Sequence, residues 1–172
     1  AAIDVPPADN SAMDGYALRH GDWVNEDSPL QLSQRITAGT PPGPLAAGTA
    51  ARIFTGAEVP AGADTVVMQE HCSADNEAVQ VRELPAQGAN IRRRGQDIAR
   101  GQQVLAAGQQ LRAQDLGLAA SLGCATVPVY RRLKVAILST GDELIEPGEP
   151  AAPGQIYNSN RFTMKGQLSA WG

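Results

Sequence analysis

Residues 9–17, DNSAMDGYA, constrain the fold more than any other stretch of this sequence. The stretch places two carboxylates and a glycine around the apolar residue Met13, so it matches neither a helical nor a strand pattern. Gly15 permits a positive φ, and Asp and Asn side chains bond to nearby backbone groups, as they do in tight turns. The stretch therefore predicts a turn that holds the carboxylate of Asp14 in a fixed place, which suits a functional site.

The composition predicts a folded, loop-rich protein that contains β-structure. The chain has 172 residues, enough for one domain or two small ones. Aromatic residues make up only 4% of it, so Val, Ile, Leu and Ala must form most of the core. With 18 glycines and 12 prolines it is rich in turns without reaching the range of low-complexity sequences.

Charge and cysteine usage argue against several classes of partner. A net charge of −4 and a pI near 5.1 argue against a positively charged surface that would bind nucleic acid. No apolar run approaches the length of a membrane span, and the first residues do not resemble a signal peptide. Cys72 and Cys124 are far apart and lack a C-x-x-C pattern, which argues against a zinc site or a disulfide framework. We therefore expect no nucleic-acid or membrane partner, and a reducing, cytoplasmic location.

Residues 23–92 contain short strand-like runs separated by glycine and proline. The runs predict strands at residues 52–55, 65–69 and 78–82. The segments between them include TPPGP at residues 40–44, which is typical of a loop. This pattern predicts an irregular β-rich domain, such as a small barrel or sandwich-like unit.

The pattern changes after residue 91. Residues 114–123, QDLGLAASLG, carry an apolar stripe at helical spacing and end on a glycine, which predicts a short helix. Residues 103–105 and 124–130, on either side of this helix, predict strands. We expect this part of the chain to form a small connecting segment.

A third pattern begins at Leu133. The continuous apolar run at residues 134–138, KVAIL, predicts a strand buried on both faces in a parallel sheet. Residues 139–144, STGDEL, would then form the loop at its carboxyl end, where open α/β sheets bind ligands. Residues 158–160, NSN, supply N-cap chemistry for a helix that extends through Leu168.

Together these patterns predict an α+β, multidomain fold. The irregular β-rich domain is expected to span residues 13–92, and an elongated connecting domain to combine residues 1–12 with residues 93–132. Residues 133–172 are expected to be the start of a doubly wound α/β domain that binds the cofactor, truncated after its first strand and helix.

Four polar residues stand at predicted turns or strand ends: Asp14, Thr55, Asp97 and Glu143. Three neighbouring carboxylates repel a phosphate, so the acidic members of this set make chemical sense together only around a cation. Hard oxygen ligands of this kind suit Mg²⁺ that bridges carboxylates and phosphates, which predicts Asp14, Asp97 and Glu143 as metal ligands. Taken one at a time, such residues are more often solvated or bonded to nearby backbone.

Two further segments have the chemistry of anion binding. Arg93 and Arg94 belong to an arginine run, and guanidinium groups bind phosphate through planar, bidentate contacts. The loop formed by Ser139, Thr140 and Gly141 could cradle an anion with its backbone N–H groups. The simpler interpretations are an exposed arginine run and an ordinary strand-to-loop turn.

Five segments, taken in order, resemble one known family. They are DNSAMDGYA at residues 9–17, RIFTGAEVPAGADTVVMQE at 52–70, NIRRRGQDI at 90–98, STGDEL at 139–144 and GQIYNSNR at 154–161. In this order and at this spacing the sequence closely resembles the molybdopterin molybdenumtransferases, the molybdenum insertase family that includes MoeA and the E domain of gephyrin. The resemblance extends from about residue 5 to about residue 168.

The resemblance implies a cytoplasmic, homodimeric enzyme of molybdenum cofactor biosynthesis. Members of the family insert molybdate into adenylylated molybdopterin and release AMP, assisted by a divalent cation such as Mg²⁺. The active cleft lies between the cofactor-binding domain of one subunit and the β-rich domain of its partner. An upstream molybdopterin adenylyltransferase is the expected donor of the substrate. By motif position, Asp14, Thr55, Asp97 and Glu143 match residues that the family uses functionally.

The sequence also leads us to expect that this chain is inactive by itself. The family's Gly-Gly-Val-Ser turn, its molybdate-contacting loop and its small C-terminal β domain have no counterpart in it. The alternatives to an insertase are a scaffold or dimerisation module of the same fold that binds partners or pterin without catalysis, and a non-inserting paralogue. The presence of Asp14, Asp97 and Glu143 favours an enzyme, because a scaffold would not need them.

Overall fold

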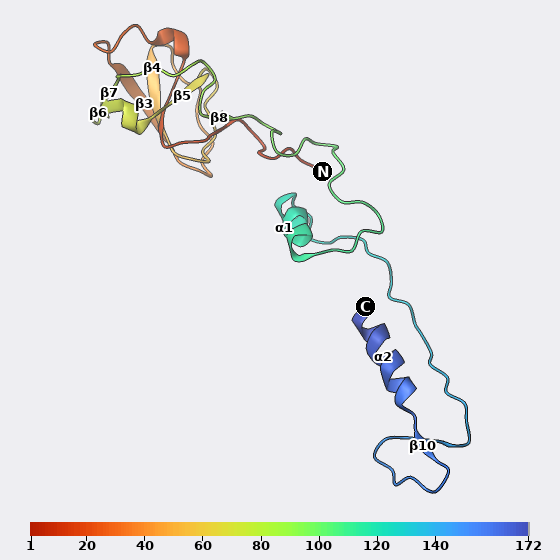
Figure 1. Cartoon of the computed structure of the whole chain (residues 1–172). Coiled ribbons are helices and arrows are strands. Elements are labelled where there is room, and N and C mark those ends of the chain that lie inside the picture. The colour runs from red at the N-terminus through yellow and green to blue at the C-terminus, as the bar shows by residue number, and fades with distance from the viewer. Residues whose placement is uncertain (172) are drawn as a thin grey trace. The chain divides into compact units, whose positions relative to one another are not determined.

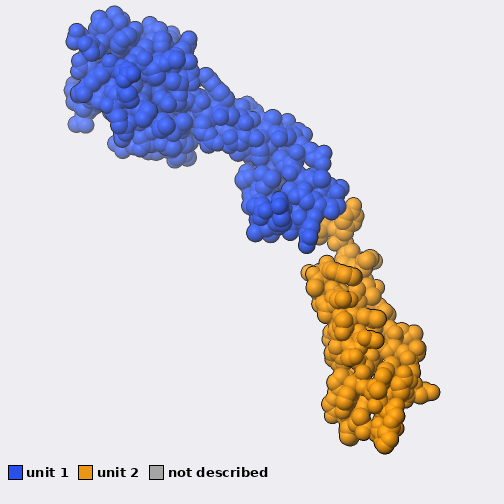
Figure 2. Space-filling model, viewed as in Figure 1, with its two compact units in different colours: residues 1–126 blue, residues 127–172 orange. Residues whose placement is uncertain are grey.

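A computed structural model describes residues 1–171 of the chain. The chain divides into two compact units, residues 1–126 and residues 127–172 (Figure 2). Unit 1 contains the main sheet and helix α1 (Ala113–Ser121), and unit 2 contains helix α2 (Ser159–Trp171). The domain boundaries derived from the sequence stay a prediction.

Unit 1 is built around a curled, mixed sheet of six strands in the order β5-β2-β4-β3-β7-β6 (Figure 1). The strands are β2 (Gly15–Leu18), β3 (Leu30–Ile36), β4 (Thr49–Ile53), β5 (Thr65–Met68), β6 (Cys72–Ala74) and β7 (Ala78–Val81). Two 3₁₀ helices, η1 (His20–Asp22) and η2 (Gln69–His71), lie between them in sequence. Neighbouring strands are antiparallel, except that β3 and β4 are parallel. The predicted β-rich region is confirmed, with β4, β5 and β7 close to the expected positions.

Both faces of this sheet carry an apolar core, because successive residues of a strand point to opposite sides. In β2, β4 and β5, adjacent residues join different clusters. The first cluster consists of Ala17, Ile36, Leu45, Ala51, Ile53, Ala57 and Val66. The second consists of Leu18, Leu30, Ala50, Val67, Val79 and Val81. A chain with few aromatic residues therefore builds its core from small and branched aliphatic side chains on two sides of one sheet.

Strand β3 contains a β-bulge that changes which face its residues occupy. Its register with β4 shifts between Leu32 and Gln34. Leu32 therefore packs against the second cluster, whereas Ile36 packs in the first although it lies an even number of residues further along. After the shift, Arg35 stands directly opposite Arg52 of β4.

A short ladder ties the N-terminal segment to the segment that follows the sheet. Strand β1 (Asn10–Ser11) pairs antiparallel with β8 (Ile91–Arg92). Val5 forms a further antiparallel bridge with Ile98. Two segments that are far apart in sequence thus run side by side, and each supplies the other's backbone hydrogen bonds.

Both predicted helices form. Helix α1 corresponds to the helix predicted at residues 114–123, and α2 extends beyond its predicted end at Leu168. The predicted cap of α2 is also confirmed, because Oδ1 of Asn158 accepts the backbone N–H of Arg161 at 3.3 Å. Among residues 1–171 we find no helix with the length and apolar character of a membrane span.

Three predicted strands do not form, at residues 103–105, 124–130 and 134–138. A strand is stable only when neighbours supply its ladder hydrogen bonds, and the described part of the chain places none beside these segments. The apolar side chains of Leu133 and Leu138 are accordingly 88% and 87% exposed. The strand pairing in unit 2 is instead a short parallel pair, β9 (Leu144–Ile145) with β10 (Ile156–Tyr157).

A glycine is required at position 15 because two strands approach each other closely there. The turn-like sequence around Gly15 suggested a positive φ, but Gly15 is not one of the residues with a positive φ. It is the first residue of β2 and is paired with β4 on one side and β5 on the other. A Cβ atom on this residue would lie 1.9 Å from the carbonyl oxygen of Val67. Glycine alone therefore allows β2 to lie this close to β5.

We expect Gly15→Ala to lower the free energy of unfolding by at least about 2 kcal/mol, because the added methyl group must push β2 away from the backbone of β5. Urea denaturation followed by circular dichroism measures the change. Gly21→Ala is the matched control, since a Cβ there meets no atom within 4 Å. Its effect should be below about 0.5 kcal/mol. Equal stability of the Gly15→Ala variant and the wild type would contradict the role assigned to this glycine.

Candidate active site

Asp14 and Thr55, which are 41 residues apart, meet at one end of two adjacent strands. Asp14 immediately precedes β2 and Thr55 follows β4, and the antiparallel register pairs Gly15 with Ile53. The backbone N–H and the hydroxyl of Thr55 both donate to Oδ1 of Asp14, at 2.8 and 2.7 Å. The structure therefore brings two of the four predicted catalytic residues into direct contact.

The loops that carry these two residues form one hydrogen-bonded unit. The N–H of Gly56 donates to the carbonyl of Ser11, and the N–H of Ser11 donates to the carbonyl of Ala57, both at 2.9 Å. The hydroxyl of Ser11 donates to the carbonyl of Met13 at 2.6 Å, and Ser11 is buried. Sequence reasoning does not single out Ser11, whose only signal is its place inside residues 9–17. Its hydroxyl fixes the turn that positions Asp14.

Asp14 is ionised at neutral pH. The backbone N–H of Thr55, followed by its hydroxyl, holds the pKa of Asp14 below its ordinary value of 3.8, and the nearby charge of Arg52 acts in the same direction. A carboxylate with a lowered pKa accepts hydrogen bonds and attracts cations but is a poor proton donor. Asp14 is therefore suited to an electrostatic or positioning role and not to general acid catalysis.

Asp97 lies in the loop after β8 and forms an ion pair with Arg92. The two side chains are 44% and 47% exposed, so solvent screens this pair. The contact closes the arginine-rich turn onto itself. The catalytic role that motif position gives Asp97 stays a prediction.

The two arginines predicted to bind phosphate are occupied by aspartates of the N-terminal segment. Arg93 Nη1 lies 2.6 Å from Asp9 Oδ2, and Arg94 Nε lies 2.7 Å from Asp4 Oδ2. The backbone N–H of Arg94 donates to Asp9, and that of Arg100 donates to Asp4. These backbone bonds, followed by the guanidinium contacts, hold the pKa of both carboxyls below 3.8. The run acts as a clamp between two chain segments, and its phosphate-binding role stays a prediction.

The predicted anion loop of unit 2 lies beside the first turn of α2. Ser139 and Thr140 line a pocket of about 240 Å³ together with Asn158 and other residues at the start of the helix. Gly141 has a φ of +147°. Residues with a side chain rarely adopt this backbone conformation, so the loop depends on glycine at this position. A helix N-terminus beside a polar loop is a suitable place for an anionic ligand.

The predicted Mg²⁺ ligands do not gather into one cluster in the described residues. Among residues 1–171, no group of three or more His, Cys, Asp or Glu side chains is placed to hold a metal ion. Asp14 bonds to Thr55, Asp97 pairs with Arg92, and Glu143 belongs to the other unit. The donor set of this chain does not by itself fit a complete Mg²⁺ site, and the assignment of the ion to these residues stays a prediction.

Comparison with known proteins identifies the family. Residues 1–123 match the family model described as the MoeA N-terminal region (domain I and II). The chain belongs to the MoeA family. A molybdopterin molybdenumtransferase of Haemophilus influenzae is 47% identical to it over 165 residues, which cover 95% of this chain and 41% of that protein. The family predicted from the five sequence segments is thus confirmed.

Two further comparisons agree with membership of the MoeA family. A molybdopterin molybdenumtransferase of a Nostoc species is 43% identical over 169 residues, 95% of this chain and 39% of that protein. The crystal structure of a molybdopterin biosynthesis MoeA protein from Pyrococcus horikoshii matches with a TM-score of 0.91 and 35% identity. That match covers 99% of this chain and 45% of the other. The chain therefore spans roughly two fifths of the length of the MoeA relatives it matches.

Cys72 is a half-buried thiol and not a nucleophile paired with the adjacent His71. Burial raises the pKa of Cys72 to about 11. His71 Nδ1 instead lies 2.8 Å from Glu83 Oε2. Since the thiolate is the reactive form of cysteine, this pair does not supply catalytic chemistry at neutral pH.

We expect Thr55→Val to raise the pKa of Asp14, but not fully to its ordinary value, because the backbone N–H of residue 55 remains as a donor. NMR titration of side-chain carboxyl carbons between about pH 2 and pH 6 measures this. A lowered pKa in the folded state means that these bonds stabilise the chain above about pH 4 and that this contribution is lost as the pH falls further. Thr40→Val removes a hydroxyl that bonds to Thr37 Oγ1 at 3.1 Å, and it should leave the pKa of Asp14 unchanged. An unaltered pKa in the Thr55→Val variant would refute the hydroxyl contact.

Alkylation by iodoacetamide at pH 8 should label Cys72 at least about tenfold more slowly than the exposed Cys124. A pKa of about 11 leaves only about one thiol in a thousand ionised at that pH. Peptide mass spectrometry over time gives both rates from the same sample, so Cys124 serves as the internal reference. Equal rates for the two cysteines would contradict the burial of Cys72.

Proposed function

We propose that this chain forms the β-rich and connecting part of a molybdopterin molybdenumtransferase. The complete protein would insert molybdate into adenylylated molybdopterin and release AMP. Support comes from the relatives of Haemophilus influenzae and Nostoc, which carry this enzyme name. The observation within the chain that carries the proposal is the contact of Asp14 with Thr55, through two short hydrogen bonds to one carboxylate oxygen.

In this proposal Asp14 supplies a fixed negative charge and Thr55 a fixed hydroxyl at the edge of the substrate site. Release of AMP by hydrolysis requires a water to attack phosphorus while the bond from phosphorus to the bridging oxygen breaks. Placement of the water and the phosphate relative to fixed charges accounts for most of the catalysis in such reactions. The Thr55 hydroxyl donates its proton to Asp14, and its oxygen can still accept a bond from the water or the substrate.

A divalent cation, which we take to be Mg²⁺, completes the proposed reaction as the family resemblance implies. Such an ion would neutralise the phosphoanhydride when bound. The described residues do not supply a group of three ligands for it, so the role derived for this chain rests on Asp14 and Thr55 alone. Asp97, Glu143 and the loop at residues 139–141 are the further candidates for contact with the substrate.

We further propose a cytoplasmic homodimer that receives its substrate from a molybdopterin adenylyltransferase. In a dimer, the β-rich unit of one subunit would complete a site on the cofactor-binding domain of its partner. The chain alone is proposed to be inactive, since it spans 41% of the Haemophilus influenzae relative. Its exposed apolar residues at 133–138 also indicate a strand that requires further sheet neighbours.

The Asp14→Asn substitution in the complete natural protein should lower AMP release by at least about a hundredfold, because it removes the fixed charge while keeping the side-chain shape. AMP formed from adenylylated molybdopterin is measured by chromatography with and without molybdate and Mg²⁺. Asp27→Asn changes an exposed aspartate outside the site and is the matched control with wild-type activity. The 172-residue chain is assayed in parallel and should release no AMP.

Release by the wild-type protein that depends on both additions would support the insertase. Full activity of the Asp14→Asn variant would exclude the proposed role of this residue while leaving the reaction itself in place. Binding of the substrate without any release by the wild-type protein would favour the scaffold alternative. Dimer content, measured by light scattering, should be equal in the wild type and both variants.

A further inference from the structure

Arg35 and Arg52 lie side by side on the sheet of unit 1. They stand directly opposite each other on the parallel strands β3 and β4. Among the described residues, neither guanidinium belongs to any of the ion pairs. Arg92, Arg93 and Arg94, in contrast, each form an ion pair with an aspartate. Two adjacent unpaired cations repel each other, so their arrangement favours the binding of an anion.

Aromatic rings and backbone groups hold the two guanidinium groups in place. Arg35 and Arg52 lie 4.9 and 4.7 Å from the centroid of the Phe54 ring, and Arg52 lies 5.0 Å from that of Tyr16. Arg52 also donates to the carbonyl of Gly15 at 3.2 Å and to the side-chain oxygen of Gln69 at 2.6 Å. Stacking orients a guanidinium but does not cancel its charge. The pair is thus preorganised and still positive.

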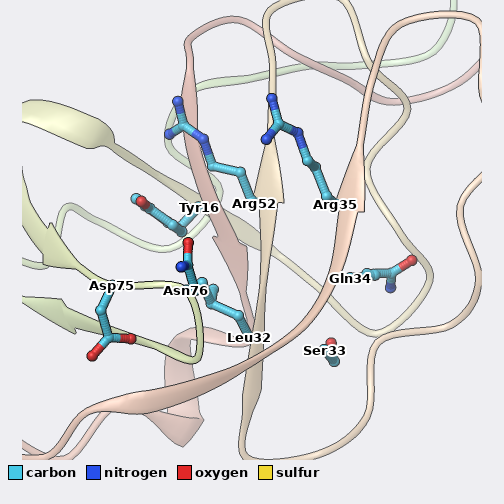
Figure 3. A pocket seen from close by; sticks show the side chains of 8 residues that line it. All are labelled: Tyr16, Leu32, Ser33, Gln34, Arg35, Arg52, Asp75 and Asn76. Carbon is cyan, nitrogen blue, oxygen red and sulfur yellow. The ribbon is translucent and has the colours of Figure 1, made fainter.

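The two side chains line an open pocket of about 340 Å³, which falls in the size range of small-ligand sites. Figure 3 shows that they extend in the same direction from neighbouring strands. The other lining residues are Tyr16, Leu32, Ser33, Gln34, Asp75 and Asn76. The Tyr16 hydroxyl and the Asn76 amide add polar groups at the pocket wall, and Leu32 adds an apolar surface.

The acidic groups near the pocket are already engaged. Oδ1 of Asp75 accepts the backbone N–H groups of Glu77 and Ala78, both at 2.8 Å. Its carboxylate points away from the two guanidinium groups (Figure 3). Asp14 is close enough for Arg52 to influence its pKa, but its Oδ1 is bonded to Thr55. Within residues 1–171, neither carboxylate forms an ion pair with Arg35 or Arg52, and Asp14 acts on Arg52 only from a longer distance.

We propose that Arg35 and Arg52 bind the phosphate group of a small phosphate monoester in this pocket. Two guanidinium charges match a dianion, and a phosphate monoester carries close to two negative charges at neutral pH, whereas a carboxylate carries one. The planar guanidinium forks also fit pairs of phosphate oxygens. The site goes beyond the proposed function and uses a different set of residues, so each can fail without the other.

Amide NMR spectra of the 172-residue chain, titrated at constant ionic strength, test the proposal. The probes are inorganic phosphate, AMP and acetate. Phosphate and AMP should both shift the signals of Tyr16, Arg35 and Arg52, and acetate should bind at least about tenfold more weakly. Tighter binding of AMP than of phosphate would identify a nucleotide as the source of the phosphate group. Equal affinities would identify the phosphate group alone as the ligand.

Arg35→Gln should weaken phosphate binding about tenfold or more, because one of the two charge-assisted contacts is lost. Arg35 is exposed, so the variant keeps the sheet, which thermal unfolding verifies. Arg35→Lys keeps the charge without the planar fork and should give an intermediate affinity. Arg82→Gln, at another exposed arginine of unit 1 outside the pocket, is the matched control with unchanged binding. Absence of shifts, shifts confined to other residues, or equal affinity of the Arg35→Gln and Arg82→Gln variants would overturn the proposal.

Discussion

The close approach of Gly15 to the carbonyl oxygen of Val67 is the constraint on which the rest of unit 1 depends. Because no side chain separates the two backbones, β2 pairs with β5 on one side and with β4 on the other. The pairing with β4 then sets Asp14, the residue just before β2, against Thr55, the residue that follows the end of β4 by two positions. The position of the candidate catalytic carboxylate is therefore a consequence of backbone packing, and the same glycine serves the sheet and the site.

Arginine side chains serve two different purposes in unit 1. Arg93 and Arg94 are neutralised by Asp9 and Asp4, and together with the ladder between β1 and β8 they hold the N-terminal segment against residues 91–98. The lowered pKa values of these two aspartates mean that the clamp is complete at neutral pH and weakens only in acid. In the part of the chain that the structure describes, Arg35 and Arg52 have no such partners, and they differ from the clamp in stacking on aromatic rings.

Features governed by local chemistry could be predicted from the sequence, whereas those that depend on distant neighbours could not. The strands at β4, β5 and β7, both helices and the Asn158 cap follow from periodicity and capping residues. The apolar run at residues 134–138 has the composition of a central strand, but composition cannot supply the strands that must flank it. At the site, the bend at residues 12–14 was predictable, but the strands β1 and β2 that lie on either side of it were not, because residues 9–17 show no strand pattern. The supporting hydroxyl of Ser11, the aspartate partners of Arg93 and Arg94, and the pairing of Arg35 with Arg52 all depend on contacts across long sequence separations.

The β-bulge in β3 accommodates one more residue than regular pairing with β4 would need. If the same residues of β3 paired with β4 without a bulge, the register would place Gln34 opposite Arg52, and the alternation of the pleat would turn Arg35 to the other face. Ile36 would at the same time leave the first cluster, to which it contributes a fully buried side chain. Deletion of Ser33 alone would instead turn the bulge into regular pairing and leave Arg35 opposite Arg52 and Ile36 opposite Ile53, so this strand can lose one residue there without moving either side chain to the other face.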